Sequence, residues 1–203
     1  MAGQTPEQPA PAGDAPAADE PTHIIYTRQE LALELRQSEI ISNLSQIIYD
    51  RATNTTVSID HSFAVVMTQD CDLLWDYDNR QKGAAGTLSS VLLYAAEPTQ
   101  EARANVPPGR DIWKRIVQNS DEGYHLLERI PPECDTLGHG IDSLLIDFKN
   151  FFTLPPEDVY QQCAAGTAVR RSRLEMPYRE HLQCRAAYYF QRVTLPAPHE
   201  YDA

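Results

Sequence analysis

The amino-acid sequence predicts an α+β fold. Short apolar segments rich in β-branched and aromatic residues are bounded by turn residues, which is typical of strands. Stretches whose apolar residues recur every three or four positions lie between and after these segments, which is typical of helices. Of the 203 residues, 42% are hydrophobic and 23% are charged, a composition that can form a core. We expect a single α+β domain over residues 22–196.

Four segments are predicted strands. The clearest covers residues 62–68, which are apolar throughout and β-branched at the centre. A run without polar alternation predicts a strand buried on both faces. The other predicted strands cover residues 88–95, 124–130 and 143–148.

The predicted helices lie in two places. Residues 98–104 and 111–119 form a helical insertion between the second and third strands. A short helix begins at Pro156, and an amphipathic C-terminal helix covers residues 177–193, with Pro177 at its first position. The apolar face of this last helix contains Tyr178, Leu182, Ala186, Tyr189, Phe190 and Val193.

The two ends of the chain are predicted to lie outside the domain. Residues 1–21 are rich in Ala and Pro and carry four acidic residues but no Lys or Arg, which predicts a disordered acidic tail. Residues 197–203 are expected to be a flexible C-terminus. No apolar run approaches the roughly 20 residues of a membrane span, and no basic and apolar leader is present, so we expect a cytoplasmic protein with no membrane partner.

An acidic tetrapeptide follows the clearest strand. Because strand ends present side chains to solvent, Gln69, Asp70 and Asp72 are candidate binding residues. The alternative is that both aspartates cap a turn or a helix that starts at Leu73, with Cys71 as a small buried apolar residue.

An arginine cluster is the second candidate binding site. Residues 170–192 contain six arginines and two glutamates, whereas residues 22–169 contain 11 Lys or Arg and 21 Asp or Glu, a net charge of −10. One interpretation is a patch for nucleic-acid phosphates, with Tyr178 and Tyr188 available for stacking on bases. The other is that the arginines pair with carboxylates of their own domain. The candidate residues are Arg170, Arg171, Arg173, Arg179 and Tyr178.

The cysteines give only a sparse metal-binding pattern. Structural zinc usually has ligands in two close pairs, and only Cys134 and His139 approach that spacing, with Cys71 as a possible third ligand. No C-x-x-C pair is present, and reduced thiols are expected. We assign no cofactor and keep a zinc-stabilised domain as an alternative.

The order of elements resembles that of the PemK/MazF-like family of small SH3-like barrels. Residues 65–68, Val-Val-Met-Thr, resemble the "VVLS" strand of that family. Residues 144–148, followed by a turn and the helices after Pro156, are similar to its later strand and C-terminal helix. The resemblance covers residues 36–193 and implies a small, partly open antiparallel β-barrel. It also implies a metal-independent endoribonuclease, for which Thr68 and Arg80 are the candidate catalytic residues.

Three functions follow from these features. We favour a non-catalytic interaction module that binds a protein or a nucleic acid through the segment after Thr68 and the Arg-rich C-terminal segment. The toxin-type endoribonuclease and the zinc-stabilised domain are the alternatives. The sequence does not indicate the oligomeric state.

Overall fold

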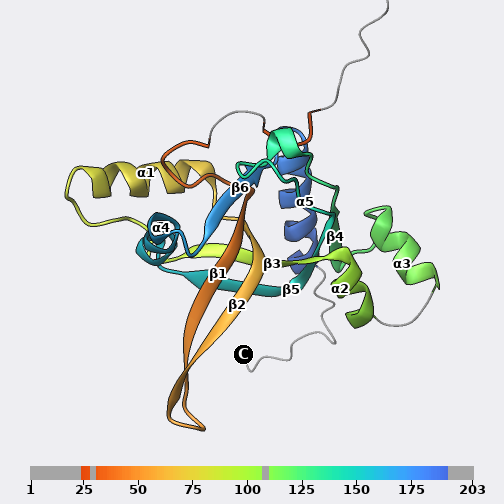
Figure 1. Ribbon diagram of the computed structural model, residues 1–203, viewed down its shortest axis with the longest axis horizontal. Helices are drawn as coiled ribbons and strands as arrows, with labels where there is room; N and C mark the ends of the chain where they lie inside the picture. The colour runs from red at the N-terminus through yellow and green to blue at the C-terminus, as the bar shows by residue number, and fades with distance from the viewer. Residues whose placement is uncertain (1–23, 28–30, 107–109, 192–203) are drawn as a thin grey trace, which may run out of the picture.

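The computed structural model describes residues 24–27, 31–106 and 110–191. Six strands form one antiparallel sheet in the order β4-β5-β3-β2-β1-β6 (Figure 1). The strands are β1 (Glu39–Asp50), β2 (Thr55–Val66), β3 (Val91–Pro98), β4 (Tyr124–Leu127), β5 (Leu144–Leu154) and β6 (Val169–Arg173). No helix within the described ranges is long and apolar enough to cross a membrane.

Within the described ranges, five α-helices and one short 3-10 helix surround the sheet (Figure 1). Pro156 stands at the start of α4, where its missing N–H costs no hydrogen bond, and the left-handed Gly166 ends that helix. The helices are α1 (Asp70–Gln81), α2 (Thr99–Asn105), α3 (Arg110–Val117), η1 (Pro132–Cys134), α4 (Pro156–Ala165) and α5 (Tyr178–Gln191).

The sheet has an apolar core on each face. In β2, Val65 packs into the core covered by α5, whereas Ala64 and Val66 pack into the core covered by α1 and α4. Successive side chains of a strand point to opposite faces. Because both faces are covered here, all three side chains are fully buried. The α5 side contributes Leu182 and Ala186 to the first core. This arrangement explains the continuous apolar run in the sequence.

The α+β class is confirmed, and so are the helical insertion and the C-terminal helix. The sheet is open, with β4 and β6 as unpaired edges among the described residues, so the predicted barrel closure is not confirmed. The predicted termini, residues 1–21 and 197–203, lie outside the described residues. Two strands were not predicted: β6, which is rich in arginine, and β1, whose apolar residues are interrupted by polar ones.

The β1–β2 hairpin is much longer than its neighbours and extends out of the body of the protein (Figure 1). Only the inner end of each strand is paired with the rest of the sheet: β1 with β6 at residues 39–42, and β2 with β3 at residues 63–66. Residues 51–54 form the turn, with Asn54 in the left-handed conformation.

Candidate functional site

The segment after β2 is anchored before it leaves the sheet. The backbone N–H of Met67 donates to the carbonyl of Leu92 (2.9 Å), and the Thr68 hydroxyl accepts from the N–H of Leu92 (2.8 Å). The chain then enters α1 directly, with Gln69 as its N-cap residue and Asp70 as its first residue. The alternative in which a helix starts at Leu73 was therefore wrong by three residues, and both aspartates lie in the first turn, where the helix dipole favours negative charge.

Asp70 ties three segments together. Its carboxylate accepts hydrogen bonds from Arg36 Nε (3.0 Å), from the N–H of Gln37 (2.7 Å) and from Arg179 Nη1 (2.8 Å). Partial burial raises the pKa of Asp70, but these hydrogen bonds and positive charges outweigh it and lower the pKa below its ordinary value. The structure therefore brings two predicted binding residues, Asp70 and Arg179, into contact with each other.

The remaining arginines of the predicted patch also have carboxylate partners. Arg170 donates to the fully buried Glu39, with Nε at 2.8 Å, and to the carbonyl of Glu34. Arg171 forms two hydrogen bonds of 2.7 Å with Asp135. Nη2 of Arg173 lies 3.1 Å from the Glu175 carboxylate. These contacts agree with the internal-pairing interpretation, because a phosphate would have to displace a carboxylate at each site.

One face of α1 is fixed against the body. Leu73 is buried in the core, and the buried Asp76 accepts from Arg80 Nε (2.6 Å) and from the N–H of Leu88 (2.8 Å). Arg80 also forms an ion pair with Glu157 of α4. Positions 73, 76, 77 and 80 follow the spacing of one helical face, so this face sets the orientation of the helix.

The opposite face of α1 is exposed and partly apolar. Trp75 is 66% exposed and Leu74 is 42% exposed, and both lie between the exposed Asp72 and Asp78. Cys71 is exposed on the same face, one turn before Trp75. Neither aspartate has an ion-pair partner within 4.0 Å among the residues that the structure describes. We call Cys71, Asp72, Leu74, Trp75 and Asp78 the α1 face.

Sequence reasoning found only the first turn of this site. Trp75 and Leu74 were missed because the helix starting at Leu73 was only one alternative and its exposed face was not worked out. A helical period would have placed Leu73 and Asp76 on one side and Trp75 on the other. Cys71 was expected to be buried in the capping alternative, and this was wrong because it lies on the outward side of the helix. Tyr178 is half-buried and packs against the α5-side core.

The candidate ribonuclease residues lie at opposite ends of α1. Thr68 precedes the helix, whereas Arg80 is in its last turn and is held by Asp76 and Glu157. Ten helical steps of 1.5 Å separate the two ends by about 15 Å. The structure therefore does not bring these two side chains together.

The candidate zinc ligands are also dispersed. Cys71 is exposed on α1, whereas Cys134 is buried and its Sγ lies 3.7 Å from the carbonyl oxygen of Tyr26. His139 is in an exposed loop whose backbone N–H donates to Asp135. Among the described residues, no group of three or more His, Cys, Asp or Glu side chains could hold a metal ion.

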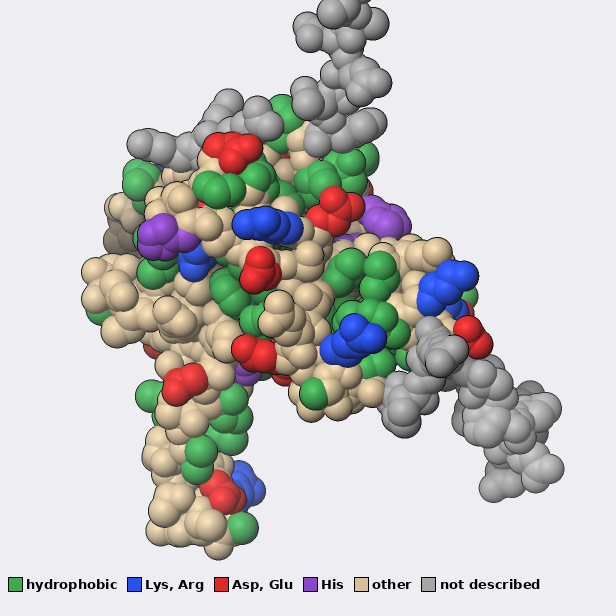
Figure 2. Space-filling model, turned by 45° about the vertical axis from the view of Figure 1, so that its right-hand side comes forward, with side chains coloured by type: hydrophobic (Ala, Val, Ile, Leu, Met, Phe, Trp, Pro, Cys, Tyr) green, Lys and Arg blue, Asp and Glu red, His purple; other side chains and the backbone are tan. Residues whose placement is uncertain are grey.

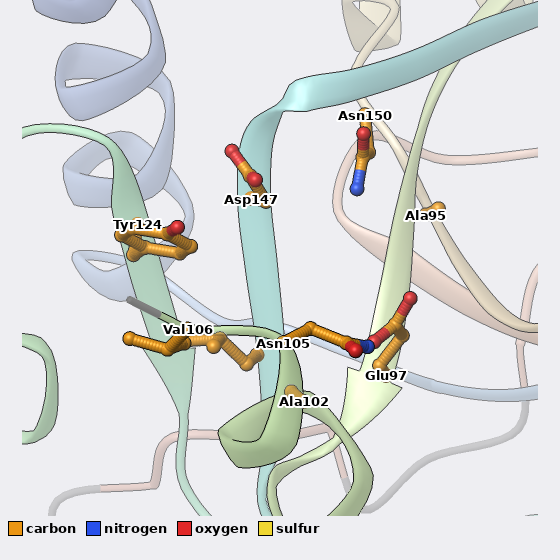
Figure 3. Close-up of a pocket in the computed structure, with 9 residues that line it drawn as sticks. Ala95, Glu97, Ala102, Asn105, Val106, Tyr124, Asp147 and Asn150 are labelled. Carbon is orange, nitrogen blue, oxygen red and sulfur yellow. The ribbon is translucent and has the colours of Figure 1, made fainter. Parts of the chain in front are cut away.

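A separate cavity of about 240 Å³ lies between the sheet and α2 (Figure 3). Leu145 and the small Ala95 and Ala102 contribute apolar lining, and Glu97 and Asp147 contribute carboxylates. Figure 3 shows Asn105 beside Glu97, and Tyr124 on the opposite side of the cavity. Its volume is below the range of about 300–1,000 Å³ that is common for ligand pockets.

Comparisons with known proteins give no information on the α1 face or on the cavity beside α2. Models of known protein families and the sequences of curated proteins were searched, and neither search finds a match to this chain.

Proposed function

We propose that this protein is an interaction module that binds another protein through the α1 face. The observation that carries the proposal is Trp75, a tryptophan left 66% exposed on a helix whose other side is fixed to the body. Tryptophan is enriched among the residues that dominate binding energy at protein interfaces. A rigidly held helix also loses little conformational freedom on binding, which favours affinity.

The chemistry of the face defines the partner. Leu74 and Trp75 provide an apolar centre, and Asp72 and Asp78 place negative charge on either side of it. The chain as a whole has a net charge of −12. The complementary surface is an apolar pocket with Lys or Arg at its rim.

A protein is favoured over a nucleic acid for two reasons. The arginines that would contact phosphates, Arg170, Arg171, Arg173 and Arg179, are each bonded to a carboxylate of the same chain. The exposed charges next to Trp75 are acidic and would repel phosphates.

The test uses the full-length chain as bait in extracts of the source cells, followed by direct titration of each captured protein. Trp75→Ala is expected to weaken binding about 30-fold, which corresponds to the roughly 2 kcal/mol of an interface hot spot. Asp72→Lys with Asp78→Lys is expected to slow association and to reverse its salt dependence. Tyr188→Ala, at a 55% exposed aromatic residue of α5, is the matched control and is expected to bind normally.

Two native cysteines locate the site without any substitution. Cys71 lies on the α1 face, whereas Cys184 is exposed on α5. A saturating partner is expected to slow alkylation of Cys71 and to leave that of Cys184 unchanged. Binding that is insensitive to Trp75→Ala and leaves Cys71 unprotected would refute the proposal, and so would a captured species that ribonuclease removes.

A further inference from the structure

The outer part of the β1–β2 hairpin has no cover from the rest of the described chain. We call residues 46–59 the arm, in which β1 and β2 pair only with each other. The last anchor before the arm is Ser45, whose N–H and carbonyl oxygen are hydrogen-bonded by the side chain of Gln162 in α4. A two-stranded hairpin without further cover has little stability of its own in water.

One face of the arm is an apolar stripe. Ile48 lies opposite Val57 and Gln46 lies opposite Ile59, and residues directly opposite each other share a face. The three apolar residues are each 38–40% exposed. Figure 2 shows hydrophobic side chains along the projecting arm.

This stripe continues a core of the body. The next pair inward on the same face is Leu44 opposite His61. Leu44 is fully buried in the core on the α1 side. The His61 ring stacks on the ring of Phe152 from the same core, with the ring centroids 3.8 Å apart. The apolar surface therefore runs from that core into solvent without a break. An extended apolar surface of this kind marks an interaction site.

The outer edge of β2 is also open. From Thr55 to Ser62 its outward N–H and carbonyl groups have no strand partner among the described residues, because pairing with β3 starts at Phe63. A long apolar edge strand is a template for another strand. A partner that binds at the β2 edge must therefore supply both an unpaired strand edge and an apolar face.

The charge of the arm indicates which kind of molecule binds it. Asp50 and Arg51 are its only charged residues, so the arm is neutral in a chain with a net charge of −12. A neutral surface gives neither a nucleic acid nor a strongly charged protein an electrostatic advantage. A second copy of this acidic chain, in contrast, can bind at the neutral arm, because electrostatic repulsion between the two copies is smallest there. The arms also keep the two acidic bodies apart.

The β2 edge is also complementary to itself. With Ser58 opposite Ser58 of a second copy, Val57 falls opposite Ile59 of that copy on the same face. Asp60 then faces Thr56, and no like charges meet. We propose that two copies of the protein pair antiparallel through the β2 edges of their arms, forming a four-stranded ribbon with one continuous apolar stripe. Such an interface buries on the order of several hundred Å² per chain, which is typical of a weak, reversible dimer.

The main test is sedimentation velocity of the full-length protein from low micromolar to near-millimolar concentration. The wild type is expected to change reversibly from monomer to dimer. Val57→Lys with Ile59→Lys is expected to stay monomeric at every concentration, because lysines would face one another across the two-fold axis. The matched control is Ile47→Lys, at a residue that is 72% exposed on the other face of the arm, and it is expected to dimerise like the wild type.

Two further variants keep the proposal falsifiable. Replacing residues 46–59 by Asn-Gly is expected to give a folded monomer, since no residue of the arm belongs to a core of the described structure. Ser58→Cys, with Cys71 and Cys184 changed to Ser, is expected to form a disulfide-linked dimer on mild oxidation, because directly opposed residues in such a strand pair lie within disulfide reach. A wild type that is monomeric throughout, a lysine variant that still dimerises, or a Ser58→Cys dimer that does not cross-link would each overturn the proposal. Trp75→Ala is expected to leave the dimer intact, which separates this test from that of the α1 face.

Discussion

The carboxylate of Asp135 shows why a count of charges in the sequence did not identify a binding patch. Its side chain is fully buried, and five N–H groups donate to it: two from Arg171 and one each from the backbone of Leu137, His139 and Gly140. Burial raises the pKa of Asp135, but the Arg171 guanidinium and the backbone donors outweigh it and lower the pKa below its ordinary value. The Arg171 side chain thus fixes the loop at residues 135–140 against β6.

The first residue-scale prediction concerns this pair. Arg171→Met is expected to lower the free energy of unfolding by about 3–5 kcal/mol, because it leaves a buried carboxylate without its countercharge. The measurement is urea unfolding at neutral pH. Arg129→Met is the control: Arg129 lies 4.0 Å from Asp142, both side chains are largely exposed, and the expected change is within about 0.5 kcal/mol. Equal effects of the two substitutions would contradict a structural role for Arg171.

At the scale of elements, Asn43 sets the direction of the arm. Ile41 and Leu44 belong to the same core although strand alternation would place residues three apart on opposite faces. Asn43 lies between them with φ of 58°, in the left-handed region that Asn tolerates better than most residues. This inversion turns the apolar stripe of the arm toward the α1 side of the sheet.

Asn43 supplies the element-scale prediction. Asn43→Val is expected to lower the free energy of unfolding by about 1–2 kcal/mol, because a β-branched residue is strained in the left-handed conformation. Asn43→Gly is expected to be close to the wild type, since glycine adopts this conformation freely. Because Asn43 is exposed, little packing is lost in either variant, and urea unfolding measures the conformational effect directly. If Asn43→Gly were destabilised as much as Asn43→Val, the side chain rather than the backbone would be responsible.

The elements also show which patterns were informative. The inner half of β2 was predicted from its unbroken run of apolar residues, and α3 was predicted because its apolar residues recur at helical spacing. β6 was missed because its arginines do not resemble a strand, and their partners are distant: Glu39 lies 131 residues from Arg170, and Asp135 lies 36 residues from Arg171. The resemblance to PemK/MazF-like proteins stays a prediction.

At the scale of the whole molecule, the buried His125 makes stability depend on pH. Burial, with smaller contributions from the charges of Arg185 and His181, lowers the pKa of His125 from 6.5 to about 3. Above pH 6.5 the ring is neutral whether the chain is folded or unfolded. Below pH 6.5 only the unfolded chain takes up the proton, so stability falls as the pH falls toward the folded pKa.

The expected loss is about 1.4 kcal/mol per pH unit, or about 2 kcal/mol between pH 6.5 and pH 5. His125→Phe is expected to reduce this slope to the part that comes from His61, whose pKa burial also lowers, whereas the exposed His139→Ala should retain the full slope. Urea unfolding between pH 7 and pH 5 measures both. Further loss of stability is expected below about pH 3.8, because the pKa values of Asp76 and Asp135 are lowered in the folded protein. As the pH falls, these two carboxylates therefore take up protons in the unfolded chain before they do so in the folded protein. A wild type whose stability is constant from pH 7 to pH 5 would contradict a neutral, buried His125.

The sequence alone determined the fold class, the main strand and most helices, because apolar periodicity and turn residues are local properties of the chain. It also marked residues 69–72 as the segment that leaves the sheet. Only the tertiary structure decided that Arg170, Arg171, Arg173 and Arg179 pair with carboxylates, that Trp75 faces outward and that the hairpin extends beyond the sheet. Those features depend on which distant segments pack together. A side chain is exposed or ion-paired according to partners that can lie more than a hundred residues away, and no local pattern encodes them.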